Sequence, residues 1–153
     1  MNPVIKKSGW LAAVWLMGLG NALAAPAISG AWIPEQPPGA MASAVFLTMK
    51  NTSDQPEALV RATAPGFKEV QLHRSIEENG MHKMIEQKEI QVPAHGETLL
   101  APGGYHIMLI GPEQAIKAGM TIPVTLYFAD GSHETLTVPV KKRAEMMNGG
   151  MQH

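Results

Sequence analysis

The chain has 153 residues, and its 12 Lys and Arg against 13 Asp and Glu give a formal net charge of −1. This near-neutral balance argues against a nucleic-acid-binding surface. The chain contains no cysteine, which excludes a disulfide framework, a cysteine-ligated blue-copper centre and a thiol-based chaperone.

The first 24 residues have the pattern of a secretory signal peptide. Lys6 and Lys7 precede an apolar stretch over residues 10–19, and Ala22-Leu23-Ala24 is a small-residue cleavage motif. The apolar stretch is shorter than a membrane span, so a transmembrane anchor is the weaker alternative. We expect residues 1–24 to be removed, which leaves 129 residues with a net charge of −3 and no membrane span. No cysteine follows the cleavage site, so a lipid-anchored form is not expected.

From residue 25 onward the chain alternates between short strand-like segments and turns. The candidate strands are residues 27–32, 43–50, 57–64, 69–73, 88–92, 97–100, 105–110, 121–128 and 134–140. Asp130-Gly131 is a hairpin signal between the last two. This spacing predicts one all-β domain over residues 25–143, either a β-sandwich or a Greek-key barrel. Residues 144–153 contain Gly and Met without a pattern, and we expect them to form a flexible tail.

Four side chains with soft or borderline metal-binding groups have a distinctive spacing. His73, Met84, His106 and Met108 form the pattern His-x10-Met-x21-His-x-Met. Thioether and imidazole ligands together suit monovalent copper. Each residue taken alone has a second interpretation as a packing residue, since Met is a common gap filler in cores. The set as a whole favours a Cu(I) site.

The expected faces of the strands support this interpretation. His106 and Met108 are two residues apart, so they leave the same face of an extended strand, opposite Ile107 and Leu109. Alternation over residues 69–73 likewise places His73 on the outer face. We expect residues 75–83 to form a loop that brings the fourth ligand over the other three, so that the site faces outward. A structural His or Met would more naturally occupy the apolar phase.

The remaining histidines and some methionines are assigned to other roles. His95 and His133 fall in turns and are expected to be solvated. Met41 and Met49 flank the strand near residues 42–48 and are expected to be packing residues.

The chain resembles the PCuAC-type periplasmic copper chaperones, a family with a cupredoxin-like Greek-key β-sandwich. Its signature is the ligand spacing given above. Residues 70–73 (VQLH), 79–84 (NGMHKM) and 102–109 (PGGYHIML) are similar to the family's blocks, as are Ala31-Trp32 and Pro37-Pro38-Gly39. The resemblance covers residues 27–140.

The resemblance implies a periplasmic protein in which His73, Met84, His106 and Met108 hold one Cu(I). It implies delivery of copper to the copper subunit of respiratory oxidases, in the assembly of cytochrome c oxidase, alongside a Sco-type thiol protein. Met81 and His82 are further candidate ligands that compete with Met84. The family's Met- and His-containing tails imply a second copper, Cu(II), here at Met146, Met147, Met151 and His153.

Three alternatives remain open. One is a general periplasmic copper-binding or copper-tolerance protein, and another is a secreted β-sandwich that binds a non-metal partner. The third is a copper enzyme. We do not expect an enzyme, because Met ligands favour Cu(I) over cycling through Cu(II) and no nucleophile–base pair is evident.

Overall fold

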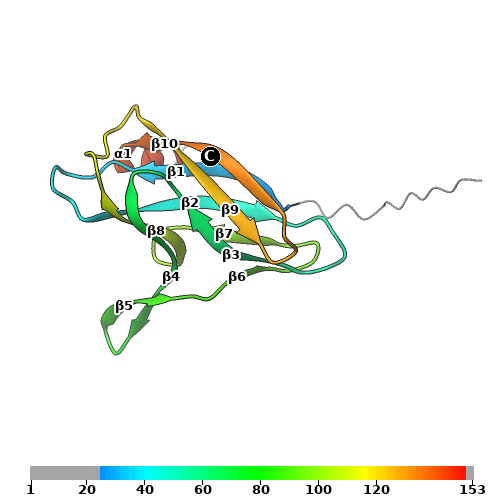
Figure 1. Ribbon diagram of the computed structural model, residues 1–153. Helices are drawn as coiled ribbons and strands as arrows, with labels where there is room; N and C mark the ends of the chain where they lie inside the picture. Colours follow the sequence, from blue (N-terminus) through cyan, green and yellow to red (C-terminus); the bar gives the residue numbers. More distant parts are fainter. Residues whose placement is uncertain (1–24, 151–153) are drawn as a thin grey trace, which may run out of the picture.

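The computed structural model describes residues 25–150, with side chains described up to Met146 (Figure 1). The predicted signal peptide lies outside the described residues. The strands are β1 (Ala27–Pro34), β2 (Ala42–Lys50), β3 (Glu57–Thr63), β4 (Phe67–Glu78), β5 (Met81–Glu86), β6 (Ile90–Val92), β7 (Glu97–Leu100), β8 (Tyr105–Pro112), β9 (Thr121–Phe128) and β10 (His133–Lys141), followed by helix α1 (Arg143–Gly150). Within residues 25–150, no helix has the length and apolar character needed to span a membrane.

The strands form one hydrogen-bonded order, β5-β4-β8-β7-β2-β1-β10-β9-β3-β6. A short parallel pairing between β1 and β10 joins the two halves of this order. The two halves enclose one apolar core, which includes Ile33, Leu47, Leu59, Leu109 and Leu126. Burial of each such side chain contributes about 1.5–3 kcal/mol, so this cluster is the main stabilising element. The predicted all-β sandwich is confirmed.

Strand β2 is buried on both of its faces. Val45, Phe46 and Leu47 follow one another and are only 0%, 6% and 2% exposed. Successive side chains on a strand point to opposite faces, so Phe46 faces away from the core that Val45 and Leu47 fill. Its ring packs on Trp32 of β1, with ring centroids 5.4 Å apart. The outer face of this half of the sandwich therefore carries an aromatic cover.

Strands β4 and β5 form a long hairpin where the sequence analysis expected a loop over residues 75–83. The turn consists of Asn79 and Gly80, both in the left-handed region at φ 54° and 77°. An Asn-Gly pair with two positive φ angles is the preferred two-residue hairpin turn. The hairpin tip projects away from the rest of the sheet (Figure 1). All six residues of β5 are exposed, because β5 is an edge strand.

We expect Gly80→Ala to loosen this hairpin, because a side chain in the left-handed region costs about 1–2 kcal/mol. Amide hydrogen exchange in β5 should accelerate about fivefold or more. Gly131→Ala is the matched control, since Gly131 has φ 91° in the β9–β10 turn. Unchanged β5 exchange in Gly80→Ala, or an equal effect from the control, would show that this turn does not hold the hairpin.

The segment after residue 143 also differs from expectation, because its backbone is helical as far as Gly150. Glu145 forms the start of this helix: its amide donates to the carbonyl of Lys142, and its carboxylate accepts from the amide of Lys142. The Glu145 carboxylate thus satisfies one backbone donor at the helix N-terminus, and Ala, Glu and Met are good helix formers. The backbone of residues 144–150 is thus helical rather than irregular, and the flexibility expected of the tail stays a prediction. Residues 151–153 lie outside the described part of the chain.

Of the two methionines that flank the strand near residues 42–48 and were expected to pack in the core, only one does so. Met49 is fully buried in the core, whereas Met41 is 77% exposed. Met41 precedes β2 and follows the Pro-rich loop, so the strand's alternation does not extend to it.

Candidate metal centre

The two histidines of the predicted site are direct neighbours across two strands. His73 of β4 pairs in register with His106 of β8. Their ring centroids lie 5.7 Å apart, with an interplanar angle of 40°. Metal–imidazole bonds are about 2 Å long, so one ion between the rings can reach both. Thirty-two residues separate the two histidines in the sequence, and the pairing of β4 with β8 brings them together.

Each imidazole has one nitrogen engaged and one nitrogen free. His73 Nε2 lies 2.7 Å from Gln71 Oε1, and His106 Nδ1 lies 3.3 Å from the carbonyl oxygen of Gly104. The other nitrogens, His73 Nδ1 and His106 Nε2, are buried and have no hydrogen-bond partner among the described residues. Buried nitrogens are rarely left without a partner. Second-shell hydrogen bonds of this kind are typical of metal-binding histidines.

Met108 lies on the same face, two residues beyond His106. In register it lies between Gln71 of β4 and Ala44 of β2. Met108, His106 and Met84 all line a hollow of about 340 Å³. Ala44 and Phe46 form part of its wall, and Arg143 at the start of α1 contributes the only charged side chain. This lining is mostly apolar, which suits a soft cation held by neutral ligands.

Met84 reaches the same hollow from the edge of the sheet. It pairs in register with Ser75, two residues from His73 on the same face of β4. Its side chain is 59% exposed. The β4–β5 hairpin, rather than a loop, thus positions Met84, the fourth predicted ligand. The site has a buried half on β8 and an exposed half on β5.

His106 is more enclosed than the sequence analysis expected. It does lie opposite Ile107, but it is only 4% exposed rather than outward-facing. Phe46 covers it, with ring centroids 6.3 Å apart. Burial lowers the pKa of His106 below its ordinary value; the Gly104 hydrogen bond opposes this, and nearby His73 adds to it. The neutral, metal-binding form is therefore favoured.

The two neighbouring candidates, Met81 and His82, are not brought to the site. Met81 pairs with Glu78, so it lies on the face of the hairpin opposite Met84. His82 shares the face of Met84 but pairs with Glu77 near the tip. Four residues of strand separate that pair from the pair formed by His73, about 13 Å at about 3.3 Å per residue. The prediction that either residue competes with Met84 is not supported by this geometry.

The tail ligands are placed only in part. Met146 lines a different hollow beside β9 and β10, together with Met120 and Val140. The side chain of Met147 and all of Met151 and His153 lie outside the description. A second copper site at the tail stays a prediction.

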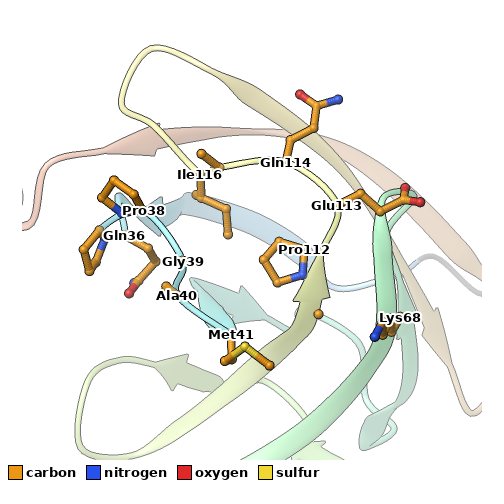
Figure 2. Close-up of a pocket in the computed structure, with 13 residues that line it drawn as sticks. Gln36, Pro38, Gly39, Ala40, Met41, Lys68, Pro112, Glu113, Gln114 and Ile116 are labelled. Carbon is orange, nitrogen blue, oxygen red and sulfur yellow. The ribbon is translucent and has the colours of Figure 1, made fainter.

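Another hollow lies between the Pro-rich loop and the segment that follows β8 (Figure 2). Its volume is about 400 Å³, and Met41, Lys68, Pro112 and Ile116 are among its lining residues. It contains one methionine and no histidine, so it lacks the ligand set. Among the described residues, no group of three or more His, Asp or Glu is arranged to hold a metal. The His–Met face is therefore the candidate centre.

Comparison with known proteins agrees with this architecture. Residues 26–140 match the family model described as "Putative lipoprotein LpqE-like". The Cu(I) form of DR1885 from Deinococcus radiodurans is 32% identical, with a TM-score of 0.65 over 81% of this chain and 83% of that chain. The copper-bound PCuAC domain from PmoF2 is 21% identical, with a TM-score of 0.66 over 80% of this chain and 97% of that chain. The chain belongs to the LpqE-like family, and its fold is that of the PCuAC-type copper-binding domains.

The PCuAC-type fold confirms the predicted cupredoxin-like sandwich. A "Putative lipoprotein" of Leifsonia xyli subsp. xyli is 40% identical over 115 residues, which is 74% of this chain and 68% of that protein. The 153 residues of this PCuAC-type chain contain no cysteine.

Sequence reasoning missed two residues that shape the centre, Gln71 and Phe46. Gln71 lies in the alternating segment 69–73 and shares the face of His73, but the sequence alone assigns it no role. Phe46 lies in a continuous apolar run, which is the signal of a strand covered on both faces. That signal predicts that Phe46 is buried on the outer face, but it does not identify His106 as its neighbour.

Proposed function

We propose that this protein is an exported metallochaperone that holds one Cu(I) with His73, Met84, His106 and Met108. The observation that carries the proposal is the pair of adjacent imidazoles, each with a buried nitrogen that has no partner among the described residues, next to a hollow lined by His106, Met84 and Met108. All four ligands are neutral and suit Cu(I). The copper-bound form of PmoF2's domain and the Cu(I) form of DR1885 support copper as the cargo.

We propose that copper leaves by ligand exchange from the β5 side of the site. Met84 lies on an exposed edge strand, whereas His106 is buried beneath Phe46. An incoming ligand of an acceptor can therefore displace Met84 first, while His106 and Met108 still hold the ion. No cysteine is available, so the ion is held by thioethers weaker than thiolates, which favours release.

We further propose that the acceptor is a respiratory oxidase copper subunit, in cytochrome c oxidase assembly, with a Sco-type thiol protein as a second partner. The signal-like N-terminus and the lipoprotein relatives support export, and we place the protein in the periplasm. This role needs no catalytic residue, and we do not propose an enzyme. A tolerance protein that only stores copper would have the same site but would not pass the metal on.

Mixing the Cu(I)-loaded protein with an apo oxidase copper domain under anaerobic conditions tests this proposal. We expect metal transfer at a rate that rises with acceptor concentration, since the acceptor's ligand takes part in the step. Met41→Leu is the matched control, because Met41 is exposed and lies outside the site. No transfer would favour storage, and a rate independent of the acceptor would contradict ligand exchange.

A further inference from the structure

Three polar side chains on one face of β4 form a hydrogen-bonded row that ends at the candidate metal centre. Gln71 Nε2 donates to Glu69 Oε2 at 2.6 Å, and Gln71 Oε1 lies 2.7 Å from His73 Nε2. An amide oxygen can only accept. His73 therefore donates through Nε2, and its lone pair lies on Nδ1. That nitrogen is the one that is buried and unpartnered within the described residues.

We propose that Glu69 and Gln71 are a positioning pair that fixes which nitrogen of His73 faces the copper. This inference rests on the proposed function and extends it to two residues outside the ligand set. Gln71 does not touch the metal in this arrangement; it acts through His73. In register Gln71 also lies opposite Met108, so it is the cross-strand neighbour of a second proposed ligand.

Glu69 fixes the orientation of the Gln71 amide, which could otherwise adopt either of two flipped orientations. If the amide were flipped, its NH₂ group would face His73 Nε2 and the proton would have to move to Nδ1. The lone pair needed by the metal would then be lost. The flipped amide would also set its oxygen against the Glu69 carboxylate, two acceptors with no proton between them. The carboxylate therefore selects the orientation that leaves Nδ1 free.

The imidazole of His106 is oriented by a backbone acceptor rather than by a side chain. This contrast explains why His73 needs a side-chain hydrogen bond to orient its ring. His106 donates to the backbone carbonyl of Gly104, which cannot flip. His73 is only half-buried and lies toward the edge of the sheet. Without Gln71 its ring is free to rotate, so the correct orientation must be found at each binding event.

Three variants separate positioning from a merely structural role. Gln71→Leu removes the acceptor, and the swap E69Q/Q71E keeps an acceptor against His73, a donor beside it and the net charge. Gln91→Leu is the matched control, because Gln91 Nε2 donates to Glu89 Oε2 at 2.8 Å in an equivalent pair far from the site. We expect Cu(I) affinity to fall about 10–100-fold in Gln71→Leu. The swap should restore it, and the control should leave it unchanged.

The apo protein provides a readout that does not depend on copper. Nitrogen-detected NMR of the imidazoles should show His73 protonated at Nε2, with that proton protected from exchange in the wild type and the swap and unprotected in Gln71→Leu. A proton on Nδ1 of wild-type His73, or unchanged Cu(I) affinity in Gln71→Leu, would overturn the inference. If the wild type binds no Cu(I), the proposed function fails, and the NMR result still decides whether the pair orients His73.

Discussion

We expect His106→Leu to abolish tight Cu(I) binding while the sandwich stays folded. His106 offers a buried nitrogen with no other partner in the described structure, and the imidazole beside it, His73, is already a proposed ligand, so it cannot replace His106. Loss of second-shell partners alone costs about 10–100-fold in metal affinity, so loss of the ligand itself should cost at least about 100-fold. Competition with a chromophoric Cu(I) chelator measures this change.

The folded state should tolerate the same substitution. Leucine fills much of the volume under Phe46, and it removes a buried polar atom that has no partner. Replacing such a group by an apolar one is close to neutral or stabilising, so the thermal midpoint of the apo protein should stay the same or rise. His95→Leu is the matched control, since His95 is an exposed turn residue paired with Asp54. Retention of tight binding by His106→Leu would remove His106 from the site.

Copper affinity should fall steeply in acid, and this is the second large effect. A proton and Cu(I) compete for the same imidazole lone pair, and an ordinary histidine titrates near about pH 6.5. Burial lowers the pKa of His106, so this ligand stays available somewhat below that pH. Affinity should be level above about pH 7. Below about pH 6 it should fall by about tenfold per pH unit for each imidazole that must lose a proton.

The sign of the stability effect follows from the same shift. The unfolded chain takes up a proton at His106 below about pH 6.5, while the folded state resists it. The unfolded state then binds more protons, so the apo protein loses stability as the pH falls through this range. Chelator competition at several pH values, with Met84→Leu as a variant that keeps both imidazoles, measures the affinity profile. A pH-independent affinity would show that the histidines are not ligands.

Local rules in the sequence were enough to predict the faces of the strands. His106 and Met108 share a face because a strand repeats every two residues, and this holds whatever the topology. The same rule could not predict that Phe46, far away in the sequence, would cover His106. Whether an outer face is open depends on which strands become neighbours, and that is a property of the whole sheet.

Two further differences have local causes that the sequence already contained. Asn79-Gly80 is a hairpin signal as strong as Asp130-Gly131, but the polar residues around it favoured a loop, so β5 was missed. An acidic residue such as Glu145 is favourable in the first turn of a helix, yet the following glycines indicated an irregular tail. In both segments the composition indicates irregular structure, whereas the local backbone is regular.

The central claim is that one Cu(I) is held by two imidazoles and two thioethers on the outer face of β4, β5 and β8. X-ray absorption of the Cu(I)-loaded protein tests it most directly. We expect nitrogen scatterers at about 2.0 Å and sulfur scatterers at about 2.3 Å, typical distances for such ligands. The spectrum should be unchanged in M146L/M147L/M151L and should lose sulfur in Met108→Leu. A spectrum without sulfur, or one in which sulfur disappears only with the tail methionines, would contradict it.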